Sequence, residues 1–314
     1  MTKIDQPVYD LPPAVSGERR DLHGRAGRLS YYVQGPTSTQ SAAAPLLLVH
    51  SVNAAASAYE VKPLYEFYRD RRMVYALELP GFGCSERTDR EYTPRLMTDA
   101  IHAMVTEIRR HHPNATIDAL ALSLSSEFLA RAALETSDAF RTLALVSPTG
   151  FDRTAANVGP PDSNRGNPLI YRLVTVPLWR RSLFNVLVSG PSIRFFLRKT
   201  WGSRHIDEGL AHYDELTAHQ DGAWHAPYWF VAGFLFSRDM SRVYQSLPMP
   251  VFMAHGVRGD FTDYRLKSAV EAKSNWTVQV FQTGALPHFE VLDTFTRHYD
   301  DFLQSRRSGA AESR

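Results

Sequence analysis

Three short segments of the chain carry side chains that together could perform nucleophilic catalysis. They contain Ser123, Asp260 and His288, in that order, and each follows an apolar run typical of a buried strand. A serine hydroxyl becomes a good nucleophile only when a neighbouring base removes its proton as it attacks. Histidine is the usual base, and a carboxylate holds it in the useful tautomer. The pattern predicts a triad with Ser123 as nucleophile, His288 as base and Asp260 as orienting acid.

Ser123 is preferred over the neighbouring serines because of the residues two positions to either side. A nucleophilic serine on a tight strand-to-helix turn requires small residues at those positions. Ala121 and Ser125 meet this requirement around Ser123, whereas Ser125 and Ser126 each have a bulky residue at one of them. The alternative interpretation is a serine that simply begins a helix.

The acid follows the predicted strand at residues 251–254. Asp260 is the candidate because it lies closest to the end of that strand. Asp263, in the same loop, is the competing candidate, and Asp152, after an earlier strand, is a third.

The base lies between the last predicted strand, residues 277–281, and a predicted terminal helix, residues 291–303. His288 is the histidine in this connection, and the chain contains 12 histidines. Its place one strand after the candidate acid distinguishes it from the others. An ordinary surface histidine is the alternative.

Attack on a carbonyl builds negative charge on its oxygen, which preorganised amide donors stabilise. One donor is predicted to be the amide of Leu124, the residue after the nucleophile. The second is predicted to be the amide of Val52, in the loop that follows the apolar run at residues 45–49. His50 in that loop is expected to be a buried structural histidine, because His288 already supplies the base.

Five features occur in order at predicted strand ends. They are the loop His50-Ser51-Val52-Asn53, the turn Gly81-Phe82-Gly83-Cys84-Ser85, the segment Ala121–Ser125, Asp260 and His288. In this order they resemble the α/β-hydrolase family over nearly the whole chain. Four positions depart from the family pattern: Ala121 and Ser125 replace the glycines around the nucleophile, Ser51 replaces a glycine after His50, and Glu78 stands where the family usually has Asp. A serine nucleophile is unlike the relatives that use aspartate, the epoxide hydrolases and haloalkane dehalogenases.

Strand and helix patterns alternate along much of the chain, which predicts an α/β fold with a doubly wound, mostly parallel sheet. The alternation stops between Pro148 and about Gln245, where only loops and helical patterns occur. We therefore expect an N-terminal arm at residues 1–28, a core at 29–148 and 246–305, a helical cap at 149–245 and a disordered tail at 306–314. The resemblance also implies a cap at this place.

Composition restricts the remaining functions. The formal net charge is +2, which disfavours a nucleic-acid partner, and the single cysteine, Cys84, permits no internal disulfide. The sequence shows neither a signal peptide nor a membrane span, so a cytoplasmic protein is expected. No spacing indicates a metal site, and the resemblance implies no cofactor.

The predicted cap is aromatic and basic. Its basic residues alternate with apolar ones; they are Arg180, Arg181, Arg194, Arg198 and Lys199. This pattern is typical of a solvated helix face, and membrane contact is the alternative. The aromatic residues are expected to pack the cap, and some of them to line an apolar pocket over Ser123.

The small-molecule substrate expected from the resemblance is a carboxylic ester of small to medium size with an apolar portion. Hydrolysis of a carbon–carbon bond in a dienoic ring-cleavage product, or of a lactone or thioester, remains open. So does a protein of the same fold that binds a ligand without hydrolysing it. The oligomeric state is not predicted.

Overall fold

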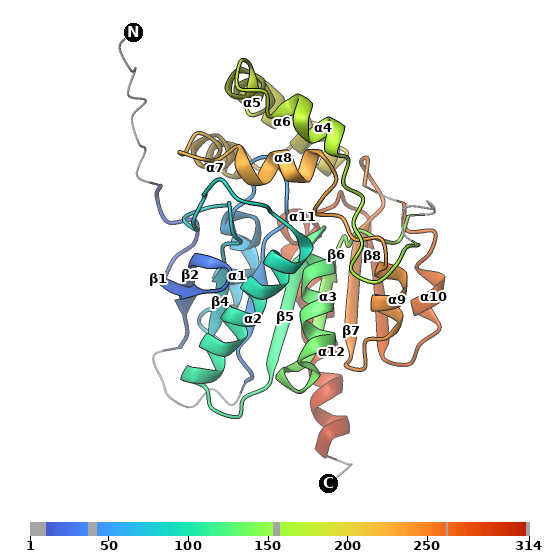
Figure 1. The fold of residues 1–314 in the computed structure, drawn as a ribbon. Helices are drawn as coiled ribbons and strands as arrows, with labels where there is room; N and C mark the ends of the chain where they lie inside the picture. The colour runs from blue at the N-terminus through green and yellow to red at the C-terminus, as the bar shows by residue number, and fades with distance from the viewer. Residues whose placement is uncertain (1–10, 37–42, 153–157, 262, 312–314) are drawn as a thin grey trace.

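An eight-stranded sheet forms the centre of the protein (Figure 1). The computed structural model describes residues 11–36, 43–152, 158–261 and 263–311. The strands are β1 (Glu18–Gly24), β2 (Gly27–Gln34), β3 (Leu46–Val49), β4 (Val74–Leu77), β5 (Ile117–Leu122), β6 (Phe140–Val146), β7 (Val251–Gly256) and β8 (Trp276–Phe281). Their order is β1-β2-β4-β3-β5-β6-β7-β8; β2 is antiparallel to both neighbours and β3 to β8 are parallel. The predicted, mostly parallel sheet is confirmed.

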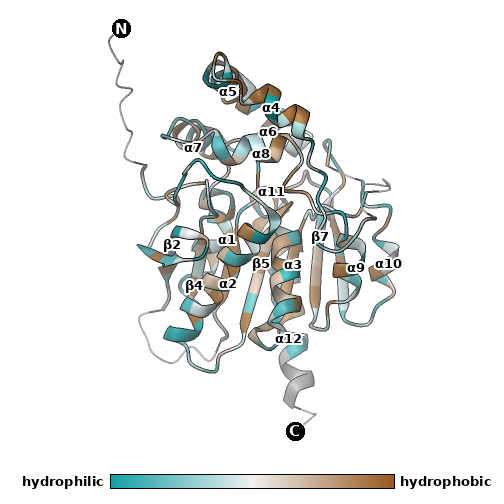
Figure 2. Cartoon of the chain, in the orientation of Figure 1, coloured by the Kyte–Doolittle hydropathy of each residue, from teal (hydrophilic) through white to brown (hydrophobic). Residues whose placement is uncertain are grey.

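Helices cover both faces of this sheet. One face packs against α2 (Pro94–His111), α3 (Ser125–Glu135), α9 (Met240–Gln245) and α10 (Ser268–Glu271). The other packs against the 3-10 helix η1 (Ala58–Val61), α1 (Lys62–Tyr68), α11 (Pro287–Glu290) and α12 (Leu292–Ala311), and a short 3-10 helix, η2 (Ser137–Ala139), precedes β6. Successive residues of β3 enter opposite cores, Leu47 one and Leu48 the other. Apolar residues therefore run through the central strands (Figure 2).

Helices also fill the connection between β6 and β7, where the sequence predicts a helical insertion. We call α4 to α8 together with α9 the inserted helices: α4 (Pro168–Val174), α5 (Arg180–Leu187), α6 (Gly190–Trp201), α7 (Glu208–Ala218) and α8 (His225–Val231). The pattern at 169–188 predicts one helix, but two are found, because Pro177 interrupts the helical hydrogen bonding. Helices α4 to α8 lie above the carboxyl ends of the parallel strands (Figure 1).

The prediction of an N-terminal arm at residues 1–28 is wrong for residues 18–28, which belong to the β1–β2 hairpin. Residues of β1 pair with β2 along their whole length, from Glu18 opposite Val33 to Gly24 opposite Gly27. The many charged residues of β1 hide the strand pattern because β1 is an exposed edge strand, and edge strands commonly carry charge. Residues 1–10 lie outside the described part.

The predicted disordered tail at 306–314 is also wrong in part, because α12 continues to Ala311. Gln304, Arg306 and Arg307 are residues with high helix propensity, which favours this continuation. Residues 312–314 lie outside the described part. No helix within the described residues is both long and apolar enough to cross a membrane.

A buried ion pair joins the segment that follows α1 to strand β5. Asp118 is fully buried and pairs with Arg72, which is 4% exposed, and with Arg141. The Thr142 hydroxyl donates a further hydrogen bond of 2.7 Å to Asp118. Removing one partner of such a pair leaves a buried charge with less compensation, which is more costly than removing an exposed pair.

We expect Arg72→Leu to lower the free energy of unfolding by about 3 kcal/mol, measured by urea denaturation. The control is Arg110→Leu, which removes an Arg side chain that is 65% exposed and paired with Glu107. This control should cost less than about 1 kcal/mol. Equal losses in the two variants would contradict the importance assigned to the Asp118 pair.

Candidate active site

Ser123 lies at the sharp turn between β5 and α3. Its φ angle is 49°, in the left-handed region that residues other than glycine rarely adopt. The Ser123 amide donates a hydrogen bond of 2.8 Å to the Val146 carbonyl of β6, which holds the turn against the sheet. A strained serine at this point of an α/β sheet is the geometry that presents a hydroxyl above the strand ends.

Two backbone amides lie beside Ser123 with no acceptor of their own. Val52 and Leu124 line the same cavity as Ser123. Within the described residues, neither of their N–H groups donates a hydrogen bond. Both amides can therefore donate to an oxygen of a bound ligand, as the sequence predicts for an oxyanion hole.

Glu60 of η1, which the sequence motifs do not indicate, fixes the loop that carries Val52. Its carboxylate accepts hydrogen bonds from the Ser51 amide at 2.6 Å, the Ser51 hydroxyl at 2.9 Å and the Asn53 side chain at 2.7 Å. Burial raises the pKa of Glu60, and the bonds from Ser51 and Asn53 oppose that rise. Ser51 thus replaces the expected glycine with a side chain that helps to hold the loop.

His50 has the structural role that the sequence suggests. Its Nδ1 donates to the Ser51 carbonyl at 2.6 Å, and its Nε2 accepts from the Leu79 amide at 3.0 Å. Burial lowers the pKa of His50 to about 4, so the ring is neutral near pH 7. The imidazole therefore joins two loops and has no nitrogen available for a ligand.

The cavity beside Ser123 is largely apolar and has a volume of about 220 Å³. Its floor comes from the loops after β3, β5, β6 and β8. Its roof comes from the inserted helices and the segment that follows α8, which contribute Leu197, Thr200, Leu210, Phe230 and Phe236. Few polar groups converge on an apolar space here, as is usual for small-molecule sites.

A second cavity, of about 230 Å³, adjoins the first and also contains Ser123. Its walls are more polar. All three candidate acids of the sequence analysis, Asp152, Asp260 and Asp263, line it. Ser123, Ser147, Thr149, Phe236 and Phe261 line both cavities. Ser123 therefore lies where an apolar chamber meets a polar one.

His288 lies in α11 and does not line either of these cavities. Its Nε2 donates a hydrogen bond of 2.8 Å to the Glu60 carbonyl, and its Nδ1 has no hydrogen-bond partner among the described residues. The ring is fully buried. The residues of the same connection that line the cavity with Ser123 are Ala285 and Leu286. Glu60, whose carbonyl accepts the hydrogen bond from His288, lines that cavity. His288 therefore lies behind the cavity wall that Glu60 forms.

Asp260 pairs with a lysine of α6. Its carboxylate lies 2.6 Å from the Lys199 ammonium, and both side chains are exposed, Asp260 to 53%. Asp263 pairs with Arg265. Within the described residues, no hydrogen bond joins Ser123, Asp260 and His288 to one another. The predicted triad thus remains a prediction, and in this structure its members hold other partners.

The buried His288 ring predicts a pH dependence of stability. Burial lowers the pKa of His288 to about 4 in the folded protein, from about 6.5 in the unfolded chain. Between these values the unfolded chain binds the extra proton, so the contribution of His288 is complete above pH 6.5 and is lost as the pH falls toward 4. We expect the stability difference between the wild type and His288→Gln to fall by about 3 kcal/mol over this range.

The measurement is urea denaturation of both proteins at several pH values. Groups common to both, such as His50 and Glu60, cancel in the difference. A difference that stays constant from pH 7 to pH 4 would contradict a buried neutral His288.

A family model described as "alpha/beta hydrolase fold" matches residues 44–169. A probable hydrolytic enzyme from Pseudomonas aeruginosa PAO1 is similar in structure, with a TM-score of 0.73, 17% identity, and 94% of this chain and 96% of that chain covered. The chain has the α/β-hydrolase fold.

Other solved structures with this fold act on different bonds according to their names. A meta-cleavage product hydrolase from Pseudomonas fluorescens IP01 has a TM-score of 0.67 and 17% identity, with 93% of this chain and 98% of that chain covered. A thermophilic esterase from Thermogutta terrifontis has a TM-score of 0.67 and 16% identity, with 92% of this chain and 99% of that chain covered. No curated protein sequence matches the chain. At these identities the α/β-hydrolase fold is shared, and the reaction is not assigned by it.

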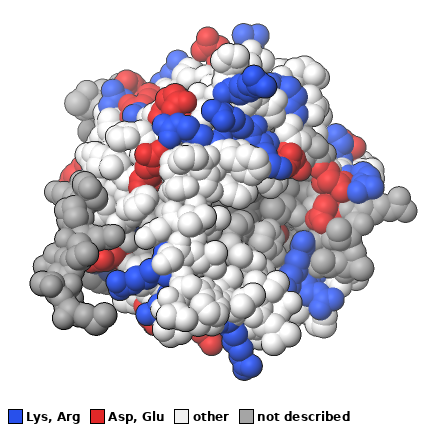
Figure 3. Space-filling view, turned by 90° about the horizontal axis from the view of Figure 1, so that it is seen from above, with Lys and Arg blue, Asp and Glu red and all other residues white. Residues whose placement is uncertain are grey.

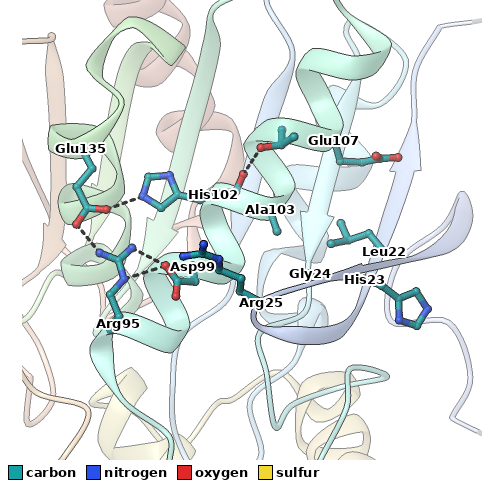
Figure 4. A pocket seen from close by; sticks show the side chains of 11 residues that line it. Leu22, His23, Gly24, Arg25, Arg95, Asp99, His102, Ala103, Glu107 and Glu135 are labelled. Atoms are coloured by element: carbon teal, nitrogen blue, oxygen red, sulfur yellow. Dashed lines mark hydrogen bonds and ion pairs between the residues drawn. The ribbon is translucent and has the colours of Figure 1, made fainter.

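A larger hollow of this α/β-hydrolase-fold protein lies far along the sheet, between the β1–β2 turn and α2, with a volume of about 820 Å³ (Figure 4). Four of the polar side chains that line it pair with one another. Glu135 lies 2.6 Å from Arg95 and 2.7 Å from His102, and Arg95 also pairs with Asp99. Ser123 does not line it. Among the described residues no cluster of His, Cys, Asp or Glu could hold a metal ion.

Proposed function

We propose that this protein hydrolyses carboxylic esters of small to medium size that have an apolar portion, with Ser123 as the nucleophile. One observation carries the proposal: Ser123 is held at φ 49° in a cavity that also receives two amides without acceptors, those of Val52 and Leu124. An ester carbonyl oxygen between these amides would bring its carbon to the Ser123 hydroxyl. The amides would then stabilise the negative oxygen of the tetrahedral intermediate.

The chemical character of the two cavities supports an ester substrate. The apolar cavity fits the hydrocarbon part, and the polar cavity offers space for water and for a leaving alcohol. Attack by Ser123 releases the alcohol and leaves an acyl-enzyme, which water then cleaves to the carboxylic acid and free Ser123. The atoms balance with water as the only co-reactant.

The proposal assigns His288 as the base and Asp260 as its partner. Both must exchange hydrogen-bond partners before they can act, His288 leaving the Glu60 carbonyl and Asp260 leaving Lys199. Catalytic hydrogen bonds often form only when substrate is bound.

The test is the initial rate of hydrolysis of p-nitrophenyl esters from acetate to palmitate. The wild type is compared with Ser123→Ala, His288→Gln and Asp260→Asn, and Asp263→Asn is the matched control. We expect loss of activity in the first three and near wild-type activity in the control. A folded wild type that hydrolyses none of the esters would overturn the proposal.

A second candidate function is ligand binding without turnover. It is favoured by the observation that His288 and Asp260 both hold other partners, which leaves Ser123 without a base in this structure. Under this candidate the cavity binds an ester or another carbonyl compound through the two amides and releases it unchanged.

One substitution distinguishes the two candidates. Ala285 lines the cavity with Ser123, so Ala285→His introduces an imidazole into that cavity. If the protein only binds its ligand, this variant is expected to gain ester hydrolysis that the wild type lacks, and Ala285→Gln, of similar size, is not. If His288 already serves Ser123, both substitutions should obstruct the cavity and lower the rate. The measurement is the p-nitrophenyl acetate rate of the three proteins.

A further inference from the structure

The outer face of helices α4 to α6 exposes many large apolar side chains. We call the exposed side chains of this region, within residues 163–206, the outer face of the insertion. Leu178 is 86% exposed, Leu169 73% and Val186 69%. The other exposed large apolar residues there are Ile170, Leu173, Trp179, Leu183, Phe195 and Phe196. Soluble proteins seldom expose so many large apolar side chains in one region unless that region contacts a partner.

The same region is strongly basic. Residues 163–206 contain eight Lys and Arg residues and no Asp or Glu, whereas the whole chain has a net charge of only +2. Three of the cations pair with acids from other segments: Arg165 with Asp152, Arg194 with Glu208 and Glu215, and Lys199 with Asp260. Among the described residues no ion pair involves Arg172, Arg180, Arg181, Arg198 or Arg204.

These features lie together at one end of the molecule. Helices α4 and α5 lie farthest from the sheet (Figure 1). Helix α6 lies beside them, and its C-terminal end reaches the core, where the Thr200 carbonyl accepts a hydrogen bond of 2.9 Å from the Ala285 amide. Viewed from this end, Lys and Arg side chains gather at the border of a broad uncharged area (Figure 3). Helix α6 divides its residues between the two sides: Leu197 is buried and lines the cavity, whereas Phe196 and Arg198 are exposed.

We propose that the outer face of the insertion binds the surface of an anionic lipid membrane. Apolar side chains at the surface of a helical layer can enter the boundary between headgroups and acyl chains, while Arg side chains beside them pair with anionic headgroups. A second copy of the chain is disfavoured, because it would bring two identical basic regions together. A nucleic acid would pair with the cations but would leave the aliphatic side chains uncovered.

The test is co-sedimentation of the full chain with vesicles of phosphatidylcholine, alone or mixed with about a quarter of phosphatidylglycerol. At about 0.1 M salt we expect the protein to bind the mixed vesicles at least about tenfold more tightly than vesicles of phosphatidylcholine alone. Binding to the mixed vesicles should weaken as added salt screens the charges. The charge variant is Arg172→Gln with Arg198→Gln, and the apolar variant is Leu178→Ser with Phe195→Ser. All four side chains are exposed, so both variants should fold.

Each lost Arg is expected to weaken binding about fivefold, so the charge variant should bind about 25-fold more weakly. The apolar variant should also lose binding. The control, Arg25→Gln with Val280→Ser, removes an exposed cation and an exposed apolar group elsewhere on the surface and should bind like the wild type. The proposal would be overturned if the charge and apolar variants bound as tightly as the control, or if the wild type showed no preference for the anionic vesicles. So would a dimer that the apolar variant abolishes while vesicles stay unbound.

Discussion

Replacing Ser123 by alanine is expected to reduce the rate of ester hydrolysis by about 1,000-fold or more, with little change in stability. The reason is that the side chain lost is the proposed nucleophile, whereas the amides of Val52 and Leu124, which hold the carbonyl oxygen, remain. Ligand affinity should therefore change little while turnover is lost. The measurement is the single-turnover rate of a p-nitrophenyl ester, together with binding of a non-hydrolysable ketone analogue.

Ser126→Ala is the matched control for this variant. Ser126 is buried three residues further along the same turn and helix, and it does not line the cavities. Its loss should leave the hydrolysis rate near that of the wild type. If Ser123→Ala kept most of the activity, Ser123 would not be the nucleophile.

The second large effect is expected for His288→Gln, a loss of about 100-fold or more in the rate of hydrolysis. Glutamine keeps an N–H that can donate to the Glu60 carbonyl, as Nε2 of His288 does now, but it cannot act as a base near pH 7. The variant therefore separates the base from the hydrogen bond. The rate is measured on the same esters, and the folded state is checked by thermal unfolding.

A purely structural role for His288 gives a different result. The Gln variant would then retain both the fold and the hydrolysis rate, whereas His288→Ala would lose stability because the buried Glu60 carbonyl loses its donor. Activity that survives His288→Gln would remove His288 from the mechanism. Activity found only after Ala285→His would instead support the binding function.

Much of the fold is predictable from local sequence. The apolar runs of β3, β5 and β7 are continuous because both faces of these strands are covered, and such runs indicate a parallel sheet. The turn at Ser123 is also predictable, because Ser123 is the one serine of this segment with small residues two positions to either side. β1 escaped detection because an exposed, charged edge strand carries no apolar period.

The direction of a side chain is harder to predict than its place in the chain. His288 follows Pro287 at the start of α11, and its Nε2 donates to the Glu60 carbonyl. The loop residue Ala285, three positions earlier, lines the cavity with Ser123. Glu60 was missed because acids are seldom fully buried, and only the folded loop shows its contacts with Ser51 and Asn53.

The most direct test of the central claim is covalent labelling by a fluorophosphonate ester, followed by intact mass and peptide mapping. A serine activated as a nucleophile attacks the phosphorus, releases fluoride and retains the phosphonyl group. The account predicts one adduct per wild-type chain, located on Ser123, no adduct on Ser123→Ala, and strongly slowed labelling of His288→Gln. A wild type that binds ester analogues but forms no adduct on Ser123 would contradict the claim and leave ligand binding as the function.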